Sequence, residues 1–292
     1  MNEMGVFVIL VIGARSKTGQ ELVRLLREAN VPARLLTRSS EPTDGPDTVV
    51  GDLAKPASLD AAMSGVDKVF LLSTPAHDER AWHRNAVDAA KRAGVGQLVR
   101  NSILGADPKS PARFVRHHGL ADGDLRESGV PYTILRPNMY MHNVSVFWPP
   151  TIDPQGNYYA PVGDARISMV DVRDVAAVAF AALTENGHLG KAYDLTGPEA
   201  LSHAEAADRL GAQLGRSVRY VPVDDDSARS AMLGAGLNEW FASGLIELYQ
   251  NYRRSGIDGY AARVDLATFD AVGVKPRTLE QSLAEDLNPE NR

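Results

Sequence analysis

The sequence predicts an α/β protein with a doubly wound parallel Rossmann sheet and a smaller, mostly helical C-terminal substrate domain. Two observations indicate the sheet. Apolar, strand-like runs alternate with helical segments as far as residue 195, and a glycine-containing turn follows the first run. A change of composition at Phe147 indicates the second domain.

The first β-α-β unit is predicted within residues 6–37. Residues 6–12 are an unbroken apolar run, as in a strand covered on both faces of a parallel sheet. Residues 33–37 form the second strand. Between them, apolar residues recur with the spacing of one helix face: Leu22, Val23, Leu25, Leu26 and Ala29.

The same alternation continues along the chain. Strands are predicted at residues 48–50, 68–72, 98–103, 132–135, 167–170 and 191–195, and helices at 56–64, 78–93, 111–127 and 172–183. Strands separated by helices in this way form a parallel sheet with helices on both faces.

The chain changes character at Phe147. Residues 147–165 are rich in proline, glycine and aromatic residues, so they are expected to leave the sheet and run over the surface. After residue 198 the pattern is mainly helical, with one strand near 218–223. We therefore predict two domains, one formed by residues 1–147 with 166–196 and a smaller one formed by residues 148–165 with 197–292.

Composition excludes several classes of function. The net charge is −6, with 31 basic and 37 acidic residues among 292, which argues against nucleic-acid or membrane-surface binding. There is no cysteine, so disulfides, thiolate zinc sites and cysteine nucleophiles are excluded. The run at residues 6–12 has no preceding cation and is too short to span a bilayer, so a cytoplasmic protein is expected.

The turn after the first strand, IGARSKTG, predicts a pyrophosphate site, because amide N–H groups and the helix dipole converge there. Gly13 would make the tight turn and Gly19 the close contact of helix with strand. A P-loop is rejected because Lys17 and Thr18 precede the second glycine instead of following it. Ser16 occupies the place of the usual central glycine, and its hydroxyl is able to donate to a phosphate.

The end of the second strand favours NADP(H) over NAD(H). An NAD site carries an acidic residue there for the ribose 2′-hydroxyl, whereas this chain has Arg38. A guanidinium pairs with a 2′-phosphate, and Arg15 in the neighbouring turn adds a second cation.

Five segments together resemble the NmrA-like family of atypical short-chain dehydrogenases/reductases. They begin GARSKTGQELVRLL, VVGDLAKPASLD, NAVDAAKRAGVG, ESGVPYTILRPN and DVRDVAAVAFAA, and the resemblance covers most of the chain. Members of that family include NAD(P)H-dependent quinone, azo-dye and triphenylmethane reductases. Others are redox-sensing regulators that bind the cofactor without turning it over.

The resemblance implies further cofactor contacts at the strand ends. Asp52 and Leu53 would flank the adenine, and Ser102 would lie near the nicotinamide. The other implied contacts follow the fourth and sixth strands: Leu72, Ser73 and Thr74, then Pro137, Asn138 and Tyr140.

The sequence departs from the pattern of ordinary short-chain dehydrogenases on the helix at residues 111–127, as many atypical members also do in lacking the tyrosine. Ordinary relatives carry Tyr-x-x-x-Lys there, and Phe114 and His118 stand at the matching positions. Phenylalanine has no proton to give, although His118 is a candidate to bind a ribose or donate a proton. Acceptors that take hydride with little help are therefore expected, namely quinones, iminium ions and cationic or azo dyes.

An apolar pocket for a flat acceptor is expected from Tyr140, Met141, Phe147, Trp148 and Trp240. No metal is expected, because His117, His118 and Asp122 have no further ligand cluster beside them. The partner is thus a small-molecule electrophile. A non-catalytic NADP(H) sensor remains the alternative, and an isomerase or epimerase ranks last because the Tyr/Lys pair is absent.

Overall fold

A computed structural model describes residues 7–38 and 47–288 of the chain. Two compact units are present. Within the described residues, unit 1 contains the chain up to Pro108, His117–Arg136 and Val175–Tyr193, and unit 2 contains Lys109–Arg116, Pro137–Asp174 and the chain from Asp194. The domain boundaries predicted above concern cofactor and substrate binding, and they stay a prediction.

In the described part of the chain the central sheet has seven strands, which confirms the doubly wound fold. In spatial order they are β3 (Thr48–Val50), β2 (Ala33–Thr37), β1 (Ile9–Ile12), β4 (Lys68–Leu71), β5 (Gln97–Asn101), β6 (Tyr132–Pro137) and β9 (Lys191–Leu195). Each neighbouring pair from β3 to β6 is parallel. The chain order reverses between β1 and β4, which is where ligands bind in open α/β sheets.

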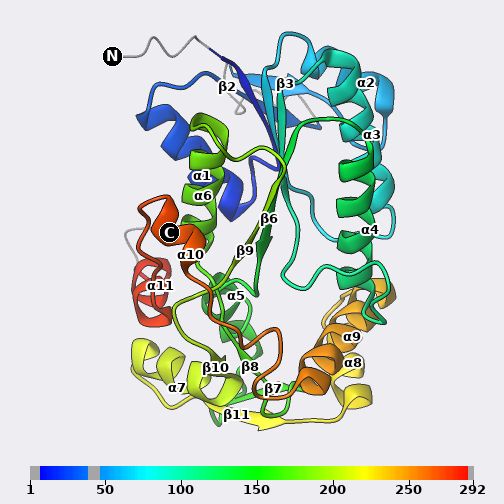
Figure 1. The fold of residues 1–292 in the computed structure, drawn as a ribbon. Coiled ribbons are helices and arrows are strands. Elements are labelled where there is room, and N and C mark those ends of the chain that lie inside the picture. Colours follow the sequence, from blue (N-terminus) through cyan, green and yellow to red (C-terminus); the bar gives the residue numbers. More distant parts are fainter. Residues whose placement is uncertain (1–6, 39–46, 289–292) are drawn as a thin grey trace. The chain divides into compact units, whose positions relative to one another are not determined.

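Helices cover both faces of this sheet, as Figure 1 shows. One face carries α1 (Lys17–Glu28) and α6 (Val172–Thr184), and the other carries α3 (Glu79–Ala93) and α4 (Arg113–Glu127). A further helix, α2 (Pro56–Met63), packs against α3. All residues of β1 are buried, which explains its continuous apolar sequence.

Within the described residues, unit 2 contains helices and two small two-stranded sheets. In β8 (Arg166–Ile167) and β10 (Leu201–Ser202) the strands are antiparallel, whereas β7 (Asn157–Ala160) and β11 (Arg219–Pro222) are parallel. The helical elements are α5 (His142–Val146), the 3₁₀ helix η2 (Pro149–Thr151), α7 (His203–Leu214), α8 (Asp225–Gly234), α9 (Glu239–Ser255), α10 (Ala267–Ala271) and α11 (Leu279–Asp286).

The structure corrects two expectations about the segments around residue 160. Residues 147–165 do not simply run over the surface, because Trp148 and Tyr158 stack at 4.1 Å between ring centroids inside the core of unit 2. Likewise, the strand expected at residues 167–170 is the short β8, and its partner is β10 instead of the central sheet.

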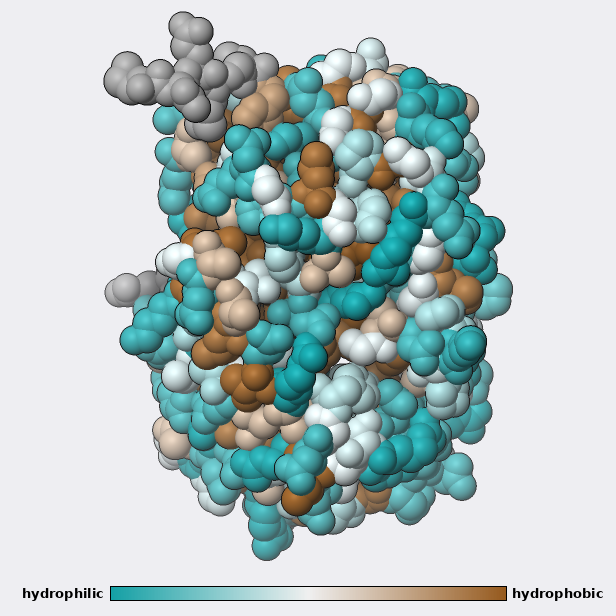
Figure 2. All heavy atoms as spheres, viewed as in Figure 1, coloured by the Kyte–Doolittle hydropathy of each residue, from teal (hydrophilic) through white to brown (hydrophobic). Residues whose placement is uncertain are grey.

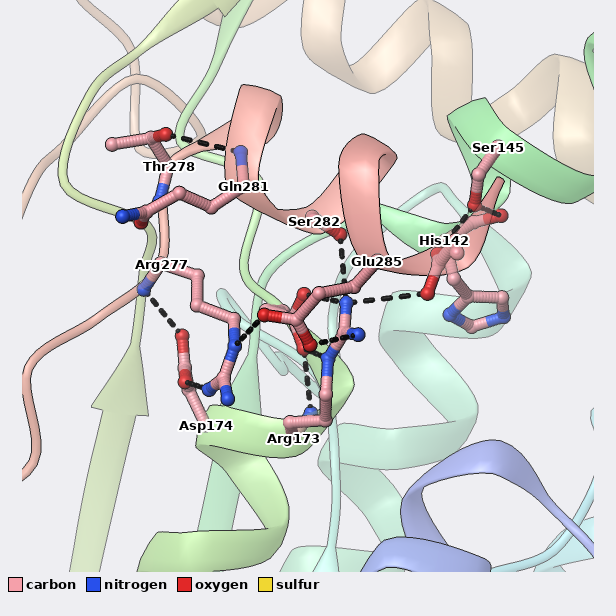
Figure 3. A network of polar contacts seen from close by, with 11 residues as sticks. His142, Ser145, Arg173, Asp174, Arg277, Thr278, Gln281, Ser282 and Glu285 are labelled. Atoms are coloured by element: carbon pink, nitrogen blue, oxygen red, sulfur yellow. Dashed lines mark hydrogen bonds and ion pairs between the residues drawn. The ribbon is translucent and has the colours of Figure 1, made fainter. Parts of the chain in front are cut away.

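A charged network fixes the last helix of unit 2 (Figure 3). The Arg173 guanidinium donates to Glu285 on α11 and to Asp171, each at 2.5 Å. Arg277 donates from its backbone amide and its guanidinium to Asp174, at 2.7 and 2.5 Å. These bonds tie α11 and the segment before it to the start of α6.

The surface is mainly polar on the face drawn in Figure 2, where hydrophobic residues form small, separate patches. In residues 7–38 and 47–288, none of the helices combines the length and apolar character that a membrane span requires.

Candidate functional site

The turn between β1 and α1 is built around two glycines and a serine. Gly13 has φ +89°, and a Cβ there would lie 2.5 Å from the carbonyl oxygen of Leu72. A Cβ on Gly19 would lie 2.1 Å from the Gly13 carbonyl oxygen. Only glycine therefore permits the turn, the start of the helix and the end of β4 to pack this closely.

Ser16 is the N-cap of α1. Its hydroxyl accepts the Gly19 amide at 3.0 Å and donates to the Gly13 carbonyl at 2.8 Å. The hydroxyl proton is thus used within the turn and is not directed at a phosphate in this structure. The amides of Lys17 and Thr18, at the first two positions of α1, precede the first intrahelical hydrogen bond and are available to an anion.

The electrostatics of this turn suit a diphosphate. The first turn of α1 contains no acidic residue, and the side chains of Arg15 and Lys17 are exposed beside it. Arg38 follows β2 and is also exposed. The hydroxyls expected next to it, Ser39 and Ser40, lie outside the described residues.

Asp52 and Leu53 connect β3 to α2. The Asp52 carboxylate accepts the Ala54 amide at 2.9 Å, which is a turn-forming contact. The amide side chain of Asn85 on α3 donates to the Leu53 carbonyl at 2.8 Å. Both residues therefore have a structural role in holding this connection.

Ser73 connects the end of β4 to a buried polar cluster on α3. Its hydroxyl oxygen lies 3.0 Å from Oε1 of Glu79 and 2.8 Å from Nε2 of His83. Ser73 itself is half-buried and its neighbour Thr74 is exposed, whereas Glu79 and His83 are buried. The hydroxyl thus lies at the boundary between the cluster and the edge of the sheet.

Arg100 is the centre of this cluster. Its side chain extends from β5 and is only 1% exposed. Three of its N–H groups donate hydrogen bonds within unit 1. Nε donates to Nδ1 of His83 and Nη2 to Nδ1 of His118, both at 3.0 Å, and Nη1 donates to Asp122. Arg136 on β6 also donates to Asp122, at 3.1 Å, so this buried carboxylate serves two guanidinium groups.

Both histidines are neutral in this arrangement. An arginine N–H donates to Nδ1 of each ring, so each ring carries its proton on Nε2. Burial, followed by the nearby Arg100 charge, lowers the pKa of His83 and of His118 well below the usual value. Near pH 7, His118 is a hydrogen-bonding group and not a ready proton donor; its catalytic assignment stays a prediction.

Glu79 behaves in the opposite way. Burial raises its pKa to about 7, although the Arg100 charge and the Ser73 hydrogen bond act in the other direction. Its second carboxyl oxygen, Oε2, is buried without a hydrogen-bond partner among the described residues. A carboxyl group that gains and loses a proton near neutral pH therefore lies behind Ser73.

Ser102 follows β5. Its amide donates to the Leu135 carbonyl at 2.7 Å, while its buried hydroxyl has no partner within the described part of the chain. A buried hydroxyl without a partner is costly, which fits a site that a ligand completes.

Phe114, which matches the tyrosine position of ordinary short-chain dehydrogenases in the sequence, lies in the first turn of α4 within unit 2. Its ring is 5% exposed and packs edge-on against Trp240, at 5.4 Å between centroids. A Cβ on Gly244 would lie 2.5 Å from this ring, so the ring is closely held against α9. No proton donor is supplied by this side chain.

The remaining predicted residues lie in unit 2 in different surroundings. Met141 and Trp148 are buried in its core, and Phe147 is 60% exposed. Tyr140 is partly exposed and stacks on His142. Asn138 is buried, and its side-chain amide donates to Ser168 and to the Ala261 carbonyl at 2.9 and 2.8 Å, with Pro137 buried before it.

Sequence reasoning missed the cluster around Arg100. One signal was present, because an arginine interrupts the apolar strand LVRNSI, and a buried arginine needs a carboxylate partner. Glu79 and His83 also share a helix face at i, i+4. Among the described residues, no group of three or more His, Asp or Glu is arranged to hold a metal ion.

Comparison with known proteins identifies the class of this protein. The model of a family described as NAD(P)H-binding matches residues 13–186. The chain is 40% identical to the NAD(P)H azoreductase of Xenophilus azovorans over 247 residues, which cover 83% of this chain and 86% of that protein.

Solved structures of reductases with bound NADPH or NADP(H) are similar to this chain as well. The NADPH complex of quinone oxidoreductase QOR2 from Escherichia coli is 26% identical with a TM-score of 0.84, covering 97% of this chain and all of that one. The Citrobacter triphenylmethane reductase complexed with NADP(H) is 25% identical with a TM-score of 0.83, over 96% and 100%. NmrA, a negative transcriptional regulator, is 19% identical with a TM-score of 0.77, over 96% and 95%, and shares the fold alone.

The chain belongs to this NAD(P)H-binding family, and its relatives identify it as an NAD(P)H-dependent reductase. The resemblance noted in the sequence is thereby confirmed. The residues fit the cofactor, because the turn at Gly13 and Gly19 leaves no room for a Cβ and the acid-free start of α1 suits a diphosphate.

Proposed function

We propose that the chain transfers hydride from NADPH to a small electrophile that needs little activation by the protein. Suitable acceptors are a quinone, an imine or iminium ion, and an azo or cationic aromatic compound. Phe114 carries this proposal, since an apolar ring packed against Gly244 replaces the phenol that activates an ordinary carbonyl substrate. Acceptors that are already electrophilic do not need that phenol.

The cofactor would be held by the turn at residues 13–19 and by Arg38. The amides of Lys17 and Thr18 would bind the diphosphate, and the exposed guanidinium of Arg38 would pair with a 2′-phosphate. Leu72, Ser73 and Ser102 would lie along the rest of the cofactor. When bound, the reduced nicotinamide supplies the hydride.

The acceptor would lie against unit 2. Phe147, Tyr140 and Trp240 present ring surface to solvent in this unit, whereas Met141 and Trp148 would act from beneath by packing. In this proposal, residues 1–147 with 166–196 bind the cofactor and residues 148–165 with 197–292 bind the acceptor.

Loss of NADPH absorbance with a panel of quinones, azo dyes, imines and cationic dyes tests the proposal. Turnover of at least one class is expected. Tight NADPH binding without turnover of any acceptor would contradict it and favour the alternative, a non-catalytic NADP(H) sensor. The missing phenol and the likeness to the NmrA fold support that alternative.

The cofactor preference has its own test. Titration by intrinsic fluorescence should give a lower Kd for NADPH than for NADH, and Arg38→Ala should remove the difference by weakening NADPH alone. Arg92→Ala, which breaks an exposed ion pair with Asp60, is the control and should keep the preference. Equal affinities in the unsubstituted protein would contradict the NADPH assignment.

A further inference from the structure

The Ser73 hydroxyl has a fixed donor on one side. Arg100 donates to Nδ1 of His83, which leaves the proton of that neutral ring on Nε2. Nε2 lies 2.8 Å from the Ser73 oxygen, so His83 donates to Ser73. The orientation of the serine proton is then decided by the other neighbour, Glu79.

Glu79 has two states with opposite effects on Ser73. As a carboxylate, Oε1 accepts the Ser73 proton across 3.0 Å. As a carboxylic acid, Glu79 donates to the Ser73 oxygen, which already accepts from His83. The serine proton must then point away from both residues and is free to bond a ligand, because Ser73 itself is only half-buried.

The surroundings of Glu79 permit both states. Besides Ser73 on β4 and His83 on its own helix, Glu79 faces Arg100 on β5 and Nε2 of His118 on α4, 3.9 Å from Oε1. Farther along, Asp122 accepts from both Arg100 and Arg136, so two guanidinium groups face two carboxyl groups in this cluster. Burial raises the pKa of Glu79 to about 7, so both states are populated near neutral pH.

We propose that Glu79 stores the proton that completes the reduction of a quinone or other proton-requiring acceptor, and that the Ser73 hydroxyl delivers it. This inference rests on the proposed reductase function. It adds a proton path, which the resemblance to the NmrA-like family does not imply. His118 would act only as a neutral neighbour of Arg100.

The step is balanced. A quinone that receives hydride gains two electrons and one proton and becomes the hydroquinone monoanion. The Ser73 O–H bond breaks as a new O–H bond forms on that anion, and the Glu79 O–H bond breaks as Ser73 regains its proton. Glu79 becomes a carboxylate, which takes a proton from solvent before the next turnover.

Two kinds of acceptor separate this step from hydride transfer. A quinone needs a proton after hydride transfer, whereas a triphenylmethane dye cation becomes a neutral product with hydride alone. For Glu79→Gln, which keeps the shape and the hydrogen bond but holds no acidic proton, we expect kcat with the quinone to fall about 100-fold. Its kcat with the dye should stay within about 2-fold, and its Kd for NADPH should be unchanged.

The pH profile gives a second readout. In the unsubstituted protein, kcat with the quinone should fall as pH rises through about 7, while kcat with the dye should not. Asp88→Asn, an exposed carboxylate on the same helix, is the matched control and should behave as the unsubstituted protein. Without any substrate, the infrared spectrum should contain a carboxylic-acid band that titrates near pH 7 and is missing in Glu79→Gln, whereas the band of Asp174, which titrates near pH 6, should be present in both proteins.

The outcomes are distinct. If the unsubstituted protein reduces both acceptors and Glu79→Gln loses activity equally on both, the inference is wrong and the reductase function stands. Absence of the infrared band that titrates near pH 7 also overturns the inference. Turnover of neither acceptor by the unsubstituted protein overturns the reductase function, and the inference with it.

Discussion

Gly13 and Gly19 are two closely packed glycines of the turn in unit 1. At both, an added Cβ would contact backbone atoms that cannot move aside. Gly123 lies inside α4 with nothing within 4 Å of the added carbon. The first two are therefore required by the turn, whereas the third is not.

This contrast gives a prediction at single residues. Gly19→Ala should weaken NADPH binding at least about 10-fold, because about 1.4 kcal/mol of misfit in the turn has that effect. Gly123→Ala, the matched control, should leave the Kd unchanged and raise the free energy of unfolding by about 0.5 to 1 kcal/mol. Equal Kd values for both variants would show that the turn does not hold the cofactor.

Glu79 also makes stability depend on pH. It is protonated up to pH about 7 in the folded chain, compared with an ordinary value of 4.5. Between these pH values the folded state therefore binds more protons than the unfolded state. The stabilisation that Glu79 contributes to the fold is full below pH 4.5 and is lost as pH rises toward 7. The loss from this one group is about 3 kcal/mol.

Denaturant unfolding at pH 5 and pH 8 measures this loss. The free energy of unfolding should decrease over that interval by a few kcal/mol more in the unsubstituted protein than in Glu79→Gln. If the free energy of unfolding decreases equally in the two proteins, Glu79 does not change its protonation between pH 5 and pH 8 in the way proposed.

Single residues were partly predictable from the sequence. Gly13 and Gly19 were predictable, because a strand-turn-helix pattern restricts which residues fit in the turn. The Ser16 hydroxyl, which the sequence offers as a donor to a phosphate, instead caps α1 and donates its proton to the Gly13 carbonyl. The contacts of Ser73 with Glu79 and His83 depend on side-chain geometry, which the spacing of residues in the sequence does not predict.

At the level of elements, local signals predicted unit 1 well. The strands at residues 33–37 and 48–50 and the end of α3 at Gly94, with φ +69°, agree with the structure. Each has a strong local cause, either an apolar run or a helix-ending glycine. Residues 147–165 were misjudged, because β7 is only four residues long and its partner β11 is remote in the sequence.

The ion pair between Asp174, at the start of α6, and Arg277, before α11, is also testable by measurement of the free energy of unfolding. Asp174 is fully buried, and Arg277 is its cationic partner (Figure 3). Arg277→Gln should lower the free energy of unfolding by about 3 kcal/mol at pH 8, because it leaves a buried carboxylate without its charge partner. Burial raises the pKa of Asp174 to about 6, so the loss should be smaller at pH 5.

Arg229→Gln is the control for that experiment. It breaks an ion pair with Glu239 in which both side chains are more than 40% exposed, and its effect should stay below about 1 kcal/mol. Similar losses in the two variants would mean that the Arg277 bonds do not fix the C-terminal helix.

For the whole molecule, fold and chemistry were predictable to different depths. The alternation of strands and helices determines a doubly wound sheet, and such a sheet binds its ligand where the strand order reverses. The acceptor is not encoded in any comparable pattern, because the residues proposed to contact it come from segments that the sequence separates. Function at this scale therefore depends on measurement of the reaction.

Transfer of the hydride itself is the most direct test. NADPH carrying deuterium on the transferable position of its nicotinamide ring is incubated with the protein and a triphenylmethane dye cation. The account predicts one deuterium per molecule on the central carbon of the reduced dye, with NADP⁺ formed in equal amount. Saturable NADPH binding with no deuterium in the dye, and no oxidation of NADPH by any acceptor in the panel, would contradict it.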